Sequence, residues 1–199
     1  MAAPTLDRAT DSLLDYIALG LLVAGPKHGY ALYQDFAEMF APVWQAGRSK
    51  FYATLAGLHD AGALDVELEP QENRPPRKVY RLTGQGQAAF EVWLREPVPQ
   101  PRDVRVLIPV KLRFYETLDW PGAHGLLDAQ IEVCRERLAF EAHRPESPEA
   151  RDDDFFFDIL YEFRRRQLMA MIDWLRTCKD RFARLAPPDS TPEKGKDRA

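Results

Sequence analysis

The sequence predicts a mainly α-helical protein with one small β-hairpin and a second, purely helical unit. Three observations lead to this fold class. Apolar residues recur with helical spacing through most of the 199 residues, the spacing changes to alternation near residue 64, and a proline-rich stretch, EPVPQPRD (96–103), interrupts the chain. We therefore expect an N-terminal unit over residues 12–96, a helical unit over 104–186, and a Pro-rich, charged, disordered tail over 187–199.

Three helices open the N-terminal unit. Apolar residues at i, i+4 and i+7 predict a helix over SLLDYIALGLLVAG (12–25), and the following proline ends it. A second helix, over HGYALYQDFAEMF (28–40), carries its aromatic residues on the inner side, Tyr30 included. We expect Gly29 to let the chain turn into this helix. The third helix covers GRSKFYATLAGLHDAG (47–62).

A β-hairpin and a fourth helix follow. Gly62 suits the left-handed position that ends the third helix. ALDVELEP (63–70) alternates apolar and acidic residues, which predicts a strand with one buried face, and RKVYRLT (77–83) predicts its partner across a long loop. Thr83 can cap the helix GQGQAAFEVWLRE (84–96). The order helix, helix, helix, hairpin, helix is the layout of a winged helix-turn-helix domain.

The C-terminal unit is predicted to be helical throughout. One helix near 104–118 is disturbed at Pro109, and the last helix, about 153–185, carries apolar residues at alternating spacings of four and three that only Arg164 breaks. A seam of this length usually faces another helix, and a single chain offers few helices to cover it. We therefore infer a homodimer. Its interface is assigned to Phe157, Tyr161, Leu168, Met171, Leu175 and Phe182.

Three stretches of the N-terminal unit resemble the PadR family of transcriptional regulators. They are LGLLVAGPKHGYALYQDF (19–36), SKFYATLAGLHDAGAL (49–64) and RPPRKVYRLTGQGQAAFEVWL (74–94). The resemblance implies DNA-binding regulation, usually repression, that a small molecule often relieves. The chain departs from the family at Lys50, where a serine is common, and at Arg48, where a proline is common.

A DNA-binding face is predicted on the third helix and the hairpin tip. On a helical wheel Phe51, Leu55 and Leu58 form the core stripe, and the opposite face is small enough to enter a major groove about 12 Å wide. Basic residues begin this helix, where the helix dipole favours phosphate, although they could instead read guanine. Tyr52 is either a core aromatic or a phosphate contact. The predicted contacts are Arg48, Ser49, Lys50, Tyr52, Ala53, Arg74, Arg77 and Lys78.

The sequence contains no pattern typical of an enzyme or a metal site. The four histidines show no metal-binding spacing, and we expect neither a catalytic residue nor a cofactor. Cys134 and Cys178 lie on apolar stripes and are interpreted as small buried side chains, with a disulfide or a metal site as the alternative. The acidic run in RDDDFFFD (151–158) starts a helix or, alternatively, holds a divalent metal. Without a signal peptide or a membrane span, a cytoplasmic protein is expected.

Two main functions remain open on these observations, besides a multidrug-type binder or artificial scaffold with incidental DNA affinity. The first is a homodimeric repressor that binds a pseudo-palindromic operator in double-stranded DNA and is released by a small aromatic or hydrophobic ligand. The alternative is a winged-helix protein-interaction adaptor without specific DNA binding, which the net charge of −4 favours. The basic residues of the hairpin tip could still bind DNA locally, although the net charge of the whole chain is negative. A ligand pocket is assigned to Trp44, Trp93, Phe156 and Trp174.

Overall fold

The computed structural model describes residues 13–71, 74–118, 121–142 and 155–185. The chain divides into two compact units, Met1–Gly122 and Ala123–Ala199. The tail that we expected to be disordered, 187–199, lies outside the described residues.

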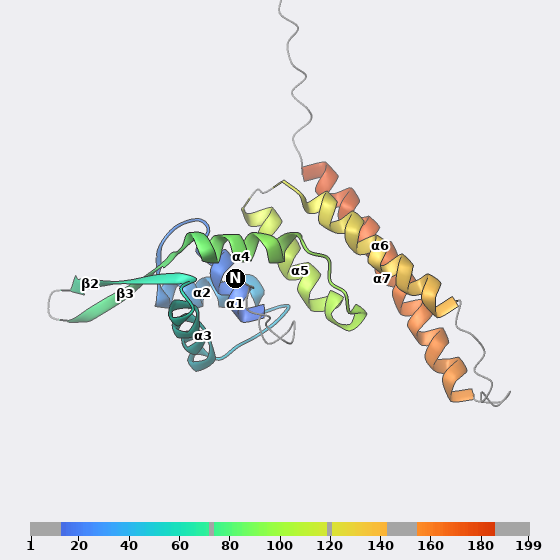
Figure 1. Ribbon diagram of the computed structural model, residues 1–199, viewed down its shortest axis with the longest axis horizontal. Helices are drawn as coiled ribbons and strands as arrows, with labels where there is room; N and C mark the ends of the chain where they lie inside the picture. Colours follow the sequence, from blue (N-terminus) through green and yellow to red (C-terminus); the bar gives the residue numbers. More distant parts are fainter. Residues whose placement is uncertain (1–12, 72–73, 119–120, 143–154, 186–199) are drawn as a thin grey trace, which may run out of the picture. The chain divides into compact units, whose positions relative to one another are not determined.

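The first unit is a winged helix-turn-helix, and a pair of helices forms the second, so the fold class predicted from the sequence is confirmed (Figure 1). The hairpin formed by β2 and β3 projects from the helices of the first unit and is called the wing. In chain order the first unit contains α1 (Leu13–Leu21), β1 (Lys27–His28), α2 (Gly29–Phe40), α3 (Arg48–Asp60), β2 (Leu64–Gln71), β3 (Arg74–Leu82), α4 (Gly84–Arg95) and α5 (Pro101–Thr117).

The wing belongs to a three-stranded antiparallel sheet with the strand order β1-β3-β2. The sequence analysis did not find β1, because a strand of two residues, Lys27–His28, is too short to show alternation. β1 lies directly before α2 and ties the start of this helix to β3. The helix-turn-helix and the wing are therefore joined through the backbone.

Aromatic and leucine side chains form the core of the first unit. Phe36, Phe40 and Phe51 are buried, as the helical spacing predicted. One prediction for an inward-facing residue was wrong, because the side chain of Tyr30 is 56% exposed. Tyr30 lies at the first turn of α2, where the aromatic spacing of the sequence does not show which flank of the helix faces water.

The turn after α3 has the geometry predicted at Gly62. The φ angle of Gly62 is 74°, and the backbone N–H groups of Gly62 and Ala63 donate to the carbonyls of His59 and Leu58. This pair of bonds closes the helix in a Schellman motif. The Thr83 hydroxyl accepts from the N–H of Gly86 and donates to the carbonyl of Gly62, so the predicted cap of α4 also binds the end of α3.

Helix α5 belongs to the first unit, whereas the sequence analysis placed it beyond a boundary at 96–104. The ring of Phe114 lies 5.2 Å from that of Phe40 and 5.1 Å from that of Phe90, so α5 contributes to the core. A Cβ on Gly20 would lie 2.5 Å from the Phe114 ring. A glycine in α1 therefore makes room for Phe114, and the proline-rich stretch is a turn inside the unit.

The second unit consists of α6 (Ala123–Ala142) and α7 (Phe155–Leu185), which lie side by side (Figure 1). They run antiparallel, because Lys179 near the end of α7 forms an ion pair with Asp128 near the start of α6. Cys134 is buried and Cys178 is half-buried, and both are free thiols. None of the described helices is long and apolar enough to cross a lipid bilayer.

Candidate nucleic-acid interface

Helix α3 has the two faces that the helical wheel predicted. Phe51, Leu55 and Leu58 are buried, and they are the large anchors of the helix. The opposite face exposes small side chains, including Ala53. A Cβ added to Gly57 would meet no atom within 4 Å. The outer face therefore carries only short side chains and contacts no other part of the described structure near Gly57. Its small residues are not needed to make room for packing within the protein.

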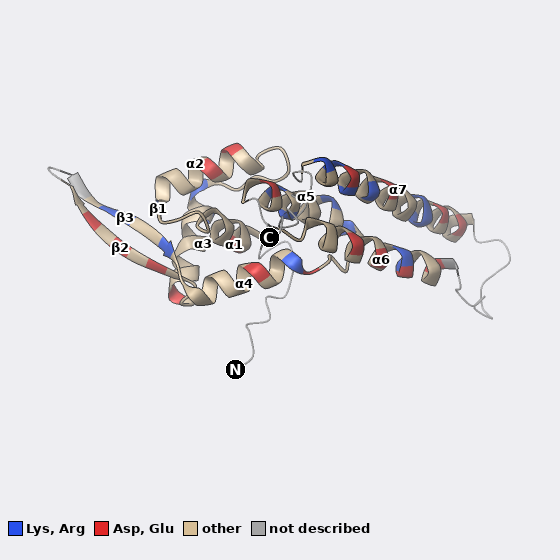
Figure 2. Cartoon of the chain, turned by 90° about the horizontal axis from the view of Figure 1, so that it is seen from above, with Lys and Arg blue, Asp and Glu red and all other residues tan. Residues whose placement is uncertain are grey.

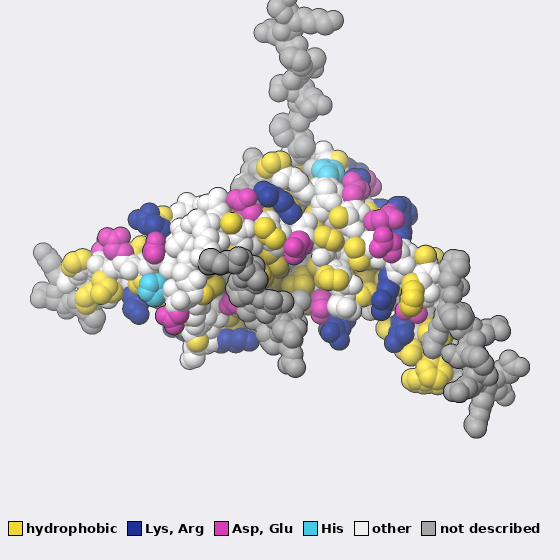
Figure 3. All heavy atoms as spheres, in the orientation of Figure 1, with side chains coloured by type: hydrophobic (Ala, Val, Ile, Leu, Met, Phe, Trp, Pro, Cys, Tyr) yellow, Lys and Arg dark blue, Asp and Glu magenta, His cyan; other side chains and the backbone are white. Residues whose placement is uncertain are grey.

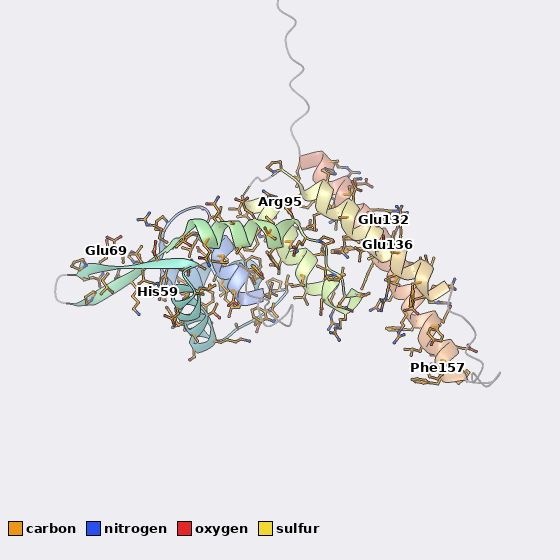
Figure 4. All side chains as sticks on the ribbon, viewed as in Figure 1. His59, Glu69, Arg95, Glu132, Glu136 and Phe157 are labelled. Atoms are coloured by element: carbon orange, nitrogen blue, oxygen red, sulfur yellow. The ribbon has the colours of Figure 1, made fainter. Side chains whose placement is uncertain are left out.

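A groove of about 590 Å³ separates α3 from the wing, and we call it the α3–wing groove. Helix α3 and the wing form its two sides, and the start of α2 closes one end. Figure 4 shows His59 on α3 close to the base of the hairpin. The lining residues include Tyr52, Ala56 and His59 from α3, Val66, Arg77, Lys78 and Tyr80 from the wing, and His28 and Tyr30 beside α2.

The register of the wing separates its acidic residues from Lys78. Glu69 pairs with Arg77 and Asp65 with Arg81, whereas Leu68 pairs with Lys78. Side chains of directly paired residues share a face of the sheet, and successive residues alternate between faces. The acidic residues of β2 therefore point away from the face that carries Lys78. Figure 2 shows how charge is distributed between the two strands, with acidic residues on β2 and basic residues on β3.

Several described cations on α3 and β3 form no ion pair. In the described part of the first unit, six exposed Lys or Arg side chains form no ion pair, and all but Arg105 lie on α3 or β3. The other five are Arg48, Lys50, Arg77, Lys78 and Arg81. By contrast, Lys27, Arg95 and Arg113 each bind a carboxylate. Positive charge is thus left available at α3 and the wing, although the whole chain has a net charge of −4.

Two of these cations rest on aromatic rings. The guanidinium carbon of Arg48 lies 5.3 Å from the ring centre of Tyr33 and 6.0 Å from that of Tyr30. The Lys50 ammonium lies 5.6 Å from the ring centre of Trp44. On the wheel Lys50 falls roughly 160° away from Arg48, so the two residues lie on opposite flanks of α3.

Tyr52 and Tyr80 pack against Gly29, which corrects the role predicted for this glycine. Gly29 does not adopt a left-handed φ angle, but a Cβ there would lie 2.9 Å from the Tyr52 ring and 3.1 Å from the Tyr80 ring. The glycine is therefore needed for close approach. Tyr52 remains 38% exposed at the groove, whereas burial, and secondarily the Tyr52 hydroxyl, raises the pKa of Tyr80.

Two histidines of the groove were not predicted as site residues. The Nδ1 atom of His28 is buried without a hydrogen-bond partner in the described structure, and its Nε2 atom lies 3.4 Å from a carboxylate oxygen of Glu69. His59 Nδ1 lies 2.9 Å from the carbonyl oxygen of Leu64. His28 lies in one of the stretches that resemble the family, but the sequence does not show that it meets His59, because β1 and the end of α3 come together only in the fold.

The four residues assigned to a ligand pocket are divided between the two units. Trp44 packs edge-on against Phe36, and Trp93 stacks on Tyr16 at 4.8 Å. Both are core contacts of the first unit, whereas Phe156 and Trp174 are exposed on α7 in the second. The backbone of Arg74 lies in β3, but its side chain is outside the description. Among the described residues, no group of three or more His, Cys, Asp or Glu could hold a metal ion.

The seam predicted for a dimer interface is partly covered within the chain. Leu168 and Leu175 are buried in the contact between α7 and α6. Met171, Tyr161 and Phe182 are half-buried, and Phe157, at the N-terminal end of α7, is 44% exposed (Figure 4). The alternating spacing correctly indicated a facing helix, but for Leu168 and Leu175 that helix is α6 of the same chain.

Comparison with known proteins places the N-terminal unit among transcriptional regulators. Residues 18–92 match the Transcriptional regulator PadR-like family, as the resemblance in the sequence predicted. The chain is 29% identical to the negative transcriptional regulator PadR of Bacillus subtilis over 127 residues, which cover 64% of this chain and 70% of that protein. It is 27% identical to the probable transcriptional regulator Rv1176c of Mycobacterium tuberculosis over 92 residues, 46% of this chain and 49% of that protein. A regulator rather than an enzyme was predicted, and these matches confirm it.

Solved structures of similar chains cover most of the sequence at low identity. The structure of Bacillus subtilis PadR with operator DNA aligns with 84% of this chain and 97% of its own, with 23% identity and a TM-score of 0.43. The structure of the same protein with p-coumaric acid aligns with 88% of this chain and 98% of its own, with 22% identity and a TM-score of 0.40.

Proposed function

Because this chain belongs, through residues 18–92, to the PadR-like family of transcriptional regulators, we propose that it binds operator DNA as a homodimer and represses transcription until a small ligand releases it. The observation that carries the proposal is the set of unpaired cations on α3 and the wing, which flank a groove and a smooth helix face. The name of the Bacillus subtilis relative, a negative regulator, supports repression rather than activation.

The outer face of α3 is proposed to enter the major groove. The groove admits a helix only when its outward side chains are small, and the exposed Ser49, Ala53 and Gly57 meet this requirement. The buried anchors Phe51 and Leu55 hold the helix against the domain, so its outer face is presented rigidly. Helix α3 therefore reads base edges in this proposal, with the contacts predicted from the sequence.

The α3–wing groove is proposed to hold one strand of the sugar-phosphate backbone. Lys78 and Arg77 supply positive charge from the wing, and the half-exposed Tyr52 can donate its hydroxyl from α3. Phosphate contacts fix the position of a protein on DNA without reading sequence. The wing therefore sets the register in which α3 meets the bases.

The dimer is proposed to form through the face of α7 that α6 leaves open. Phe156, Ile159, Phe163 and Trp174 are all exposed, with 38–65% of each side chain accessible. They fall within roughly 60° of one another on the wheel, opposite Leu168 and Leu175. Figure 3 shows apolar side chains gathered at the N-terminal end of α7. Monomeric proteins rarely leave such a stripe in water, and a second copy of α7 would cover it symmetrically.

This face also carries two of the residues that the sequence assigned to a ligand. Phe156 and Trp174 lie on the stripe, so an aromatic or apolar ligand bound there would contact both copies of α7. Such a ligand weakens DNA binding if it prefers a dimer geometry in which the two α3 helices no longer match successive major grooves. Trp44 and Trp93, engaged in core contacts, have no part in this proposal.

DNA binding is tested by titrating labelled DNA from upstream of the protein's own gene with wild type and single variants. We expect Arg77→Ala and Lys78→Ala each to weaken binding and to lower the slope of log K against log salt by about 0.9. Arg105→Ala is the matched control, because Arg105 is also exposed and unpaired but lies on α5. Wild-type protein that does not distinguish this DNA from unrelated DNA would support the adaptor function instead.

The oligomeric state is tested by size-exclusion chromatography with light scattering. We expect a dimer for the wild type and a monomer for Phe163→Glu, which places a charge in the centre of the apolar stripe. Phe140→Glu serves as the control, because Phe140 is an equally exposed aromatic residue on α6. A wild-type monomer at micromolar concentration would refute the homodimer.

A further inference from the structure

Two tyrosines of α2 lie against Arg48, the first residue of α3. The guanidinium of Arg48 is above the Tyr33 ring at 5.3 Å and above the Tyr30 ring at 6.0 Å. Arg48 forms no ion pair with a described carboxylate, so the rings are its neighbours on the protein side. The two tyrosines together form what we call the Arg48 platform.

The platform is anchored in the core at one side and open to water at the other. The Tyr33 ring packs edge-on against Phe51 at 5.6 Å, and its hydroxyl donates to the carbonyl of Ala46. Tyr30 is 56% exposed, and its hydroxyl accepts a hydrogen bond from Gln34 one turn along α2. The Tyr33 ring is therefore held by the core, whereas the exposed Tyr30 ring is tied to its own helix by one hydrogen bond.

Stacking on a ring leaves the hydrogen-bonding edge of a guanidinium free. The attraction uses the face of the planar group, whereas its N–H donors lie in the plane and point outward. An arginine held in this way loses less side-chain freedom on binding than one that moves freely in water. Its fork of donors matches the O6 and N7 acceptors of guanine, the commonest specific contact in the major groove.

Lys50 does not have the same arrangement. Its ammonium lies near Trp44 on the other flank of α3, and an ammonium is a point charge without a planar pair of donors. Of the two cations that begin α3, Arg48 is therefore the one suited to reading a base. Both residues depart from the family pattern, and Arg48 is the one whose side chain carries a planar pair of donors.

We propose that Tyr30 and Tyr33 are positioning residues that hold Arg48 for bidentate recognition of one guanine in the operator. The inference rests on the proposed function, since it needs a DNA site that the protein binds specifically. It adds two residues of α2 to a recognition surface that the sequence placed on α3 and the wing alone.

The test starts from a DNA site that the wild-type protein selects from a random library. Binding is measured for this site and for copies in which each guanine in turn is replaced by 7-deazaguanine, which lacks the N7 acceptor. The proteins are the wild type, Tyr30→Leu, Tyr30→Phe, Arg48→Ala and the double variant Tyr30→Leu with Arg48→Ala. Tyr30 is chosen because its exposure lets the variants fold.

We expect one guanine whose replacement weakens wild-type binding by roughly five- to 100-fold and leaves Arg48→Ala unaffected. Tyr30→Leu should lose roughly two- to fivefold in affinity, and only when Arg48 and this guanine are both present. Tyr30→Phe keeps the ring and should behave as the wild type. The salt dependence of Tyr30→Leu should equal that of the wild type, because no phosphate contact is removed.

Three results would overturn the proposal. The first is an equal loss from Tyr30→Leu in the Arg48→Ala background, and the second is a loss from Tyr30→Phe with a lower salt slope, which would make the hydroxyl a phosphate contact. The third is a Tyr30→Leu variant that still distinguishes guanine from 7-deazaguanine as strongly as the wild type does. In each case the selected site still stands, so the proposed function survives. If the library yields no selected site, both the proposed function and the platform fail.

Discussion

Replacing Gly57 with alanine separates the stability of α3 from its docking on DNA. Gly57 lies inside the helix, and the added methyl group would meet no atom within 4 Å. Glycine inside a helix costs about 1 kcal/mol relative to alanine, so the free energy of unfolding should rise by about that amount. The variant protein should therefore melt at a temperature a few degrees higher than the wild type.

The same methyl group should weaken DNA binding if α3 lies in the major groove. Overfilling a closely packed contact costs about 1–3 kcal/mol, which corresponds to a loss of roughly five- to 150-fold in affinity. Stability and affinity are thus expected to move in opposite directions. Thermal unfolding followed by circular dichroism measures the first, and anisotropy with the labelled upstream DNA measures the second.

A matched substitution in the second unit controls for the general effect of the change. Gly125 is an exposed glycine of α6, and a Cβ there also meets nothing within 4 Å. Gly125→Ala should leave DNA affinity unchanged. If Gly57→Ala stabilises the protein and binds DNA as tightly as the wild type, this part of α3 does not enter the groove, and the reasoning from its small residues is wrong.

Three further predictions concern the support of the interface. Gly86→Ala should lower the free energy of unfolding by about 3 kcal/mol in urea titrations, because the new Cβ would overlap the Ala63 carbonyl and displace α4 from the end of α3. Burial raises the pKa of Asp15 to about 6 from 3.8, so ionised Asp15 opposes folding, and the free energy of unfolding should fall as pH rises from 4 to 6. Asp15→Asn should remove roughly 1–2 kcal/mol of this loss, allowing for partial exposure of the carboxylate. Unfolding measured at pH 4.5 and at pH 7.5 tests this prediction. Burial lowers the pKa of Lys111 to about 8 from 10.5, so the free energy of unfolding should rise as pH rises from 8 to 10.5. Lys111→Met should abolish this rise.

The elements with strong periodicity could be predicted from the sequence. Phe51, Leu55 and Leu58 recur at helical spacing, and burial of an anchor stripe follows directly from that spacing. The cap at Thr83 and the turn at Gly62 are local in the same sense, because each depends on residues a few positions away. The wing follows from alternation, and its register places Lys78 on the face of the hairpin opposite Arg77 and Arg81.

Features that depend on distant contacts could not be predicted. The seam on α7 indicates a partner helix, but the spacing is the same whether that helix is α6 or a second copy. The exposure of Tyr30 depends on its position between Arg48 and the groove, which only the packing of α2 against α3 determines. His28 enters the groove through β1, and this strand exists because β3 pairs with it.

Under the proposed function, the charge distribution lets a protein with a net charge of −4 favour specific DNA. Non-specific binding depends on the summed attraction of phosphates to cations, so acidic residues spread over the rest of the surface weaken it everywhere. In the proposed complex, specific binding needs cations only where α3 and the wing meet the duplex, and there Arg48 and Lys78 form no ion pair with a described carboxylate. The acidic residues of β2 share the face of the hairpin that carries Arg77 and Arg81, opposite Lys78, so in the proposed complex they repel a duplex that approaches from that side. Weak non-specific binding and a few preoriented contacts together raise the ratio of specific to non-specific affinity, which is the quantity that a regulator requires.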